Sequence, residues 1–108
     1  MGEEFERKLA KTVGMGYGVL TNSGSSASLL SIAGLSSWKM NDRRLKRGEE
    51  IIVAANSFPT TVNPVIQFGL TPVFLDPDLG TYNINSNKIK EAITEKTRAL
   101  YFAHTLGN

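Results

Sequence analysis

The segment 22–26, Asn-Ser-Gly-Ser-Ser, carries residue types that bind an anion. Gly24 lacks a side chain and lets backbone amides approach a ligand closely, while Ser25 and Ser26 supply hydroxyl donors. The apolar run that follows predicts a helix, and the amides at a helix N-terminus favour a negatively charged group. A phosphate is therefore the natural ligand, although a serine-capped helix after a tight turn would have the same local sequence.

Two well-known phosphate motifs do not account for this segment. A P-loop needs a lysine after its last glycine, and Ser25 occupies that place. Gly14, Gly16 and Gly18 resemble part of a dinucleotide fingerprint. They follow a predicted helix and precede a predicted strand, which is the reverse of the order that the fingerprint needs.

Three further candidates follow predicted strands, and ligands collect at the carboxyl ends of strands in open α/β sheets. Phe58 follows the apolar strand 50–54 and could stack on a planar cofactor, with a position in the core as the alternative. Asp76 directly follows the strand 71–75, and here a turn-forming role is favoured over ligand binding. A lone histidine is usually a packed or solvated residue, but His104 follows the last predicted strand, and this position strengthens the case for a functional role.

The elements that must position these residues alternate along the chain. The predicted strands are 17–21, 50–54, 71–75 and 97–103, and the predicted helices are 3–13, 27–35, 60–68 and one that Asn85 or Ser86 caps. This alternation predicts an α/β fold with a mainly parallel sheet and covering helices. The helix 27–35 is apolar on nearly every side, so we expect it to be buried. The chain stops soon after a strand, so we expect residues 1–108 to be a single but partial domain.

The composition argues against several functions. There is no cysteine, and His104 is the single histidine, so no metal site is expected. A net charge of +2 does not indicate nucleic-acid binding, and the basic stretch 39–47 is interpreted as a solvated surface, with a nucleotide diphosphate as the lesser alternative. No apolar run approaches the roughly 20 residues that a membrane helix needs. Without a signal-peptide core at the N-terminus, we expect a cytoplasmic protein.

Several segments, taken together, resemble one family. Residues 20–30 (Leu-Thr-Asn-Ser-Gly-Ser-Ser-Ala-Ser-Leu-Leu) resemble the cofactor-phosphate segment of fold-type-I pyridoxal phosphate enzymes, and residues 58–69 are similar to their ring-stacking segment. Segments 72–76, 81–84 and 103–108 continue the series in the same order. The sequence is therefore similar to the DegT-like nucleotide-sugar aminotransferases and dehydratases. Within them it most resembles the 3-dehydrase branch that acts on CDP-4-keto-6-deoxyhexoses and makes deoxysugars for lipopolysaccharide.

The resemblance implies an N-terminal piece of the cofactor-binding large domain, with pyridoxal 5′-phosphate or pyridoxamine 5′-phosphate as cofactor and a nucleotide sugar as substrate. It assigns six positions to cofactor binding: Gly24, Ser25, Ser26, Phe58, Thr60 and His104. The first three would bind the phosphate, the phenylalanine would stack on the pyridine ring, and the last two would lie near the cofactor or sugar. The catalytic lysine or histidine and the carboxylate for the pyridine nitrogen would come after residue 108. We therefore expect no catalytic residue here and no turnover by these residues alone.

Two other interpretations stay open. The chain could be a freestanding α/β domain that binds a small phosphate ligand without catalysis. It could instead be a module that self-associates through an unfinished sheet, because exposed apolar faces and strand edges favour association. On either the family or the module interpretation we expect a homodimer or a larger assembly.

Overall fold

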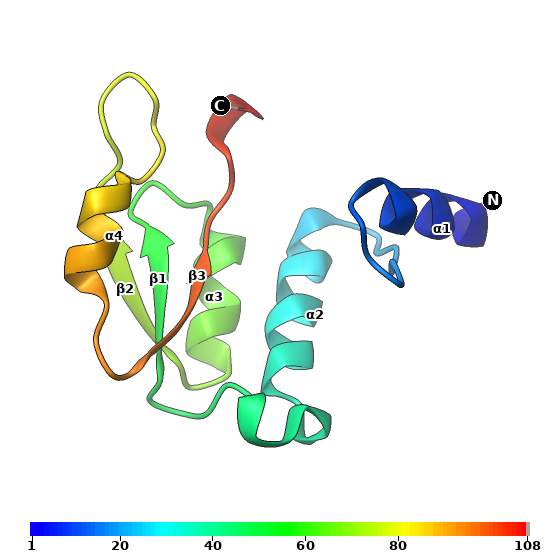
Figure 1. The fold of residues 1–108 in the computed structure, drawn as a ribbon, viewed down its shortest axis with the longest axis horizontal. Coiled ribbons are helices and arrows are strands. Elements are labelled where there is room, and N and C mark those ends of the chain that lie inside the picture. The colour runs from blue at the N-terminus through cyan, green and yellow to red at the C-terminus, as the bar shows by residue number, and fades with distance from the viewer. Residues whose placement is uncertain (108) are drawn as a thin grey trace.

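The computed structural model describes residues 1–107, which form a small parallel sheet with helices packed on it and an N-terminal helix that lies apart from the sheet (Figure 1). The helices are α1 (Gly2–Thr12), α2 (Gly24–Ser36), α3 (Pro59–Gln67) and α4 (Ser86–Ala92), with short 3-10 helices η1 (Trp38–Arg43) and η2 (Thr105–Gly107). The strands are β1 (Glu50–Ala54), β2 (Thr71–Leu75) and β3 (Thr97–Tyr101). The predicted boundaries of β1 and β2 are confirmed, and β3 ends two residues earlier than predicted.

The sheet has the strand order β2-β1-β3, and both pairings are parallel. Strands that follow one another along the chain therefore need crossover connections. α3 lies in the connection from β1 to its neighbour β2, and α4 lies in the connection from β2 past β1 to β3. The two crossovers run in opposite directions across the sheet. Because such connections are right-handed, the two helices cover opposite faces, as Figure 1 shows.

The core is built around β1. Ile51, Ile52 and Val53 are fully buried, because β1 has a strand on each side and helices over both faces. On the α3 face, Ile51 and Val53 pack with Val65 of α3 and with Ile32 of α2, which forms an outer layer against α3. The predicted buried strand at 50–54 is thus confirmed.

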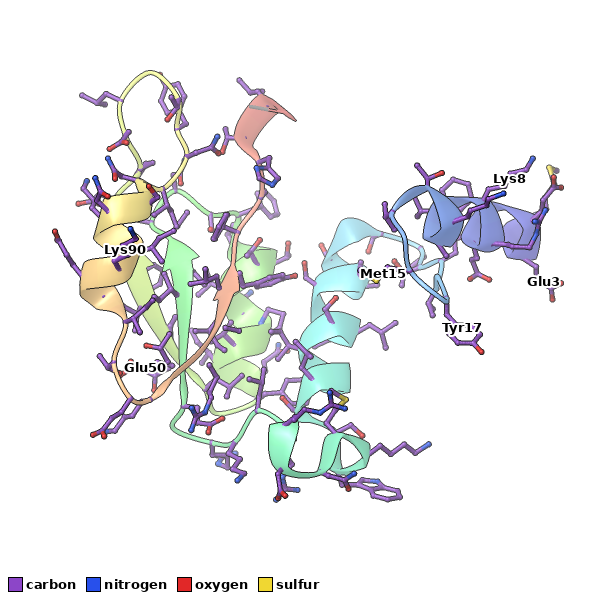
Figure 2. The ribbon with its side chains drawn as sticks, in the orientation of Figure 1. Glu3, Lys8, Met15, Tyr17, Glu50 and Lys90 are labelled. Carbon is purple, nitrogen blue, oxygen red and sulfur yellow. The ribbon has the colours of Figure 1, made fainter. Side chains whose placement is uncertain are left out.

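The strand predicted at 17–21 is wrong. A strand needs a neighbour to satisfy its backbone groups, and none of the described strands runs beside this segment. Instead, the Leu20 N–H donates to the Glu6 carboxylate at 2.6 Å, which ties the segment back to α1. The Tyr17 side chain extends away from the rest of the chain (Figure 2) and is 94% exposed.

The predicted burial of the helix 27–35 is also wrong. The helix forms, but Ile32 is its only buried residue in the described part of the chain. Leu29, Leu30 and Leu35 are between 41% and 48% exposed. The reason is that only part of the α2 surface contacts α3 and η1, and much of the rest has no neighbour among residues 1–107.

No helix within residues 1–107 is long and apolar enough to cross a membrane.

Candidate functional site

The predicted site residues lie toward one end of the structure. Figure 1 shows the N-termini of α2 and α3 at the same end as the carboxyl ends of β1, β2 and β3. Parallel strands place all their following loops along one edge of the sheet, which is where α/β proteins bind ligands. Helix N-termini add free amides and the positive end of the helix dipole. This end of the molecule is therefore suited to an anionic ligand.

The start of α2 is organised by its own side chains. The Ser23 hydroxyl accepts a hydrogen bond from the Ser26 N–H at 3.1 Å and so caps the helix. The Ser26 hydroxyl donates to Asn22 Oδ1 at 2.6 Å. This network explains why the helix begins at Gly24 rather than at 27 as predicted. It also engages both the amide and the hydroxyl of Ser26 inside the turn.

The remaining donors at this turn come from Gly24 and Ser25. Neither backbone N–H donates a hydrogen bond to any other described residue, as is usual for the first amides of a helix. The Ser25 hydroxyl likewise has no hydrogen-bond partner within residues 1–107. Two amides and one hydroxyl are thus available to a phosphate, whereas Ser26 would have to break its bond to Asn22 before it could contribute.

A depression of about 170 Å³ lies between α2 and α3. Its lining residues are Ser25, Leu29, Thr60, Asn63, Pro64 and Gln67. The structure thus brings together two of the predicted cofactor residues, Ser25 and Thr60. Gly24 instead lines a neighbouring depression of about 320 Å³, which is walled by Phe5 and Leu9 of α1 and by Leu20. Neither depression is lined by a lysine, a histidine or a metal-binding cluster of side chains.

Phe58 immediately precedes α3 and is 71% exposed. Pro59 begins the helix, where its missing N–H costs nothing, and this leaves Phe58 in extended backbone with its ring free. A position in the core, the alternative interpretation of this residue, is therefore wrong. Thr60 follows in the first turn of α3, and the two residues place an aromatic ring and a hydroxyl at the same helix end.

His104 lies in the loop after β3 and is exposed. Its ring meets the Phe102 ring edge to face, with centroids 6.5 Å apart and planes at 81°. The His104 carbonyl accepts from the Gly107 N–H at 3.1 Å. The structure places His104 at the carboxyl end of the sheet, as predicted, but it does not line the depression that holds Ser25 and Thr60. Asp76 is also apart from that depression, beside Lys88 and Glu91 of α4.

Sequence reasoning missed a set of hydrogen bonds that joins the three loops after the strands. Asn56 Nδ2 and the Thr105 hydroxyl both donate to the Tyr82 carbonyl, at 3.1 Å and 3.2 Å. Asn56 and Thr105 could have been found from their positions soon after β1 and β3. The rule that functional residues lie at the carboxyl ends of strands had already identified Phe58 and His104. Tyr82 gave no such signal, because it lies in the middle of the loop between β2 and α4.

The Glu49 carboxyl, which lies at the other end of the sheet, has a lowered pKa. The Arg98 guanidinium, hydrogen bonded to Glu49 at 2.8 Å, and the Lys46 N–H hold the pKa of the Glu49 carboxyl below its usual value. Glu49 precedes β1, at the amino ends of the strands where Figure 2 labels its neighbour Glu50. This ion pair belongs to the fold rather than to the candidate site.

Comparison with known proteins gives a consistent picture. The model of the DegT/DnrJ/EryC1/StrS aminotransferase family matches residues 1–108. The dTDP-4-dehydro-2,6-dideoxy-D-glucose 3-dehydratase of Saccharopolyspora spinosa is 53% identical over 104 residues, which are 96% of this chain and 22% of that protein. The lipopolysaccharide biosynthesis protein RfbH of Salmonella typhimurium is 52% identical over 98% of this chain and 24% of its own length.

The fold is shared with a solved enzyme. The structure of the E. coli GDP-4-keto-6-deoxy-D-mannose-3-dehydratase with bound hydrated PLP aligns with a TM-score of 0.80 and 45% identity, over 90% of this chain and 24% of that one. The predicted α/β class is confirmed, and the sheet and its helices match part of the fold-type-I aminotransferase domain. The chain spans about a quarter of the length of these relatives.

Proposed function

Because this chain belongs to the DegT/DnrJ/EryC1/StrS aminotransferase family, we propose that it supplies the phosphate-binding and ring-stacking part of a pyridoxal-phosphate-dependent nucleotide-sugar 3-dehydratase. The observation that carries the proposal is the likeness, at 45% identity over 90% of the chain, to a sugar 3-dehydratase whose structure holds PLP. The 52–53% identity to a second 3-dehydratase and to a lipopolysaccharide biosynthesis protein supports the same branch. A deoxysugar pathway for lipopolysaccharide is the setting that we propose, with a CDP-linked 4-keto-6-deoxyhexose as substrate.

The donor set at the start of α2 fits the phosphate of pyridoxal 5′-phosphate or pyridoxamine 5′-phosphate. The Gly24 and Ser25 amides and the Ser25 hydroxyl are unengaged by the described residues and sit at the positive end of the helix dipole. Ser26 would contribute mainly by holding the turn through Asn22. An anion there gains charge-assisted hydrogen bonds without any rearrangement of the backbone.

The other predicted residues would orient the rest of the ligand. The exposed Phe58 ring offers a face for the pyridine ring, and Thr60 forms the wall opposite Ser25. His104 would lie on the side of the sugar. When bound, the cofactor supplies the electron sink for the chemistry. The residues of this chain bind and orient it, and none lining the α2–α3 depression can move a proton at neutral pH. We therefore propose that residues 1–108 are inactive by themselves.

We also propose that the chain assembles as a homodimer or larger. Apolar side chains along α1 and at its C-cap residue Val13 support this, since Phe5, Leu9 and Val13 are each about half exposed, from 47% to 57%. They follow one another at steps of four residues and so form a stripe along one side of the helix. A contiguous exposed apolar surface favours a protein partner.

The test is an NMR titration of the 108-residue chain with pyridoxamine 5′-phosphate, which has an amine in place of the aldehyde and cannot condense with surface lysines. We expect saturable shifts of the Gly24 and Ser25 amides. Ser25→Ala should weaken binding about tenfold or more, because a hydrogen bond to a charged group contributes roughly 1.5–3 kcal/mol. Phe58→Ala should also weaken it, whereas Ser31→Ala, farther along the same helix, should not. Absence of shifts at Gly24 and Ser25 in the wild-type chain would contradict the proposed phosphate site.

A further inference from the structure

We propose that Asn56, Tyr82 and Thr105 form a positioning element that fixes the ring-stacking residue Phe58 and the site residue His104 relative to each other. The inference rests on the proposed function for the roles of Phe58 and His104. The element itself rests on hydrogen bonds between loops that are far apart in sequence. Its three residues are not among those that line the depression between α2 and α3. They would therefore act through their neighbours rather than on the ligand.

The centre of the element is the Tyr82 carbonyl, which lies in the loop between β2 and α4. Asn56, from the loop after β1, donates to it through Nδ2 at 3.1 Å. Thr105, from the segment after β3, donates through its hydroxyl at 3.2 Å. A carbonyl oxygen has two lone pairs, so both bonds can be made at once. A single acceptor thus joins the loops that follow all three strands of the sheet.

The backbone of Tyr82 is held in a costly conformation. Its φ is 59°, in the left-handed region that bulky residues rarely adopt. Such residues persist where the surroundings over-determine them, and they gather at functional sites. Here the Tyr82 N–H donates to the Asp78 carbonyl at 2.9 Å, and the next residue, Asn83, accepts the Thr105 N–H on its side-chain oxygen at 3.0 Å. Thr105 is therefore held by two bonds, one to each of two consecutive residues.

These contacts reach the site residues over a short distance along the chain. Asn56 is two residues before Phe58, and it lies within a turn that is closed by the Ser57 N–H, which donates to the Ala54 carbonyl at 3.0 Å. Thr105 directly follows His104, whose ring is also braced against Phe102. If the Tyr82 carbonyl lost its donors, the loops of Phe58 and His104 could move independently. The phosphate donors of α2 belong to another element and would keep their places.

This separation gives a test that a loss of overall stability could not imitate. In the 108-residue chain, Asn56→Ala and Thr105→Val should each weaken pyridoxamine 5′-phosphate binding by roughly three- to tenfold, the range expected for one neutral hydrogen bond. Affinity for inorganic phosphate, followed at the Gly24 and Ser25 amides, should stay unchanged. Thr105→Ser keeps the hydroxyl and should restore wild-type binding. Asn87→Ala removes the same amide group from an exposed position on α4 and serves as the matched control.

Two outcomes would overturn the inference. The first is wild-type affinity for pyridoxamine 5′-phosphate in both Asn56→Ala and Thr105→Val. The second is an equal loss of affinity for both ligands, which would indicate general destabilisation. If the wild-type chain bound no pyridoxamine 5′-phosphate, the proposed function would fail, and hydrogen exchange would then decide on the element. Faster exchange of the Thr105 amide in Asn56→Ala but not in Asn87→Ala supports it, and unchanged exchange in Asn56→Ala contradicts it.

Discussion

β1 and α2 are both strongly apolar, yet they lie in opposite environments. Every residue of β1 after Glu50 is buried, because the strand has neighbours at both edges and on both faces. α2 carries apolar residues on nearly every side, interspersed with serines, but it buries only Ile32 within the described chain. The apolar character of a segment therefore does not determine its burial, which depends on what lies next to it.

We expect this difference in burial to appear in the free energy of unfolding of variants in β1 and α2. Ile51→Ala should lower the free energy of unfolding by about 2–5 kcal/mol, because it opens a cavity in a filled core. Leu30→Ala removes a side chain that is 48% exposed and should cost under about 1 kcal/mol, since little area is lost from contact. Urea unfolding followed by circular dichroism measures both. Equal losses in the two variants would mean that α2 is covered in solution, and the contrast between the regions would break down.

The same contrast explains which elements could be predicted from the sequence. The ends of β1 and β2 follow from short apolar runs bounded by turn residues, and Asn85 caps α4 as one of the two predicted caps. These are local signals. The segment 17–21 has the composition of a strand, but no strand lies beside it in the described chain, and its Leu20 amide bonds to Glu6 instead. Pairing is a property of two segments, so one segment could not predict it.

In the candidate site, too, local sequence signals predicted some features and not others. The position of Ser25 at a helix N-terminus and of Phe58 and His104 after strands could be predicted, because helix starts and strand ends are visible in sequence. The bond of Ser26 to Asn22 lies within one turn, but the sequence pattern assigned this hydroxyl to the phosphate instead. That Asn56 reaches the Tyr82 carbonyl 26 residues away could not be predicted, because this contact depends on how the elements pack, which no local pattern encodes.

The exposed apolar stripe of Phe5, Leu9 and Val13 predicts self-association. We expect the wild-type chain to sediment as a concentration-dependent dimer or larger species, and Leu9→Glu to raise its dissociation constant at least about tenfold, or roughly 1.4 kcal/mol. The reason is that the stripe would lose an apolar side chain that the assembly covers, and it would gain a charge that assembly must desolvate. Lys11→Glu adds the same side chain away from the stripe and should leave association nearly unchanged. A wild-type chain that stays monomeric at high concentration would contradict the proposed assembly.

The smallest expected effect concerns two ion pairs, one beside the buried strand β1 and one on the exposed helix α1. Arg98–Glu49 joins β3 to the residue before β1, with the Glu49 side chain 16% exposed, whereas Lys8–Glu4 spans one turn of α1 with both side chains more than half exposed. The pKa of Glu49 is lowered in the folded chain, chiefly by its hydrogen bond to Arg98. Its stabilisation is therefore present above the unfolded pKa of about 4.3, and it is lost as the pH falls through the lower folded pKa.

Glu49→Gln should accordingly lower the free energy of unfolding at pH 7 by about 0.2–1 kcal/mol, the usual range for pairs open to solvent. The deficit should shrink as the pH is lowered toward 3, because the wild-type carboxyl then becomes protonated as well. Glu4→Gln removes the exposed pair and should cost no more than about 0.5 kcal/mol, as for other pairs one helical turn apart. Urea titrations at several pH values measure these differences. If Glu49→Gln lost as much at pH 3 as at pH 7, the cause would be packing of that side chain rather than its charge, and β1 would be stabilised by burial alone.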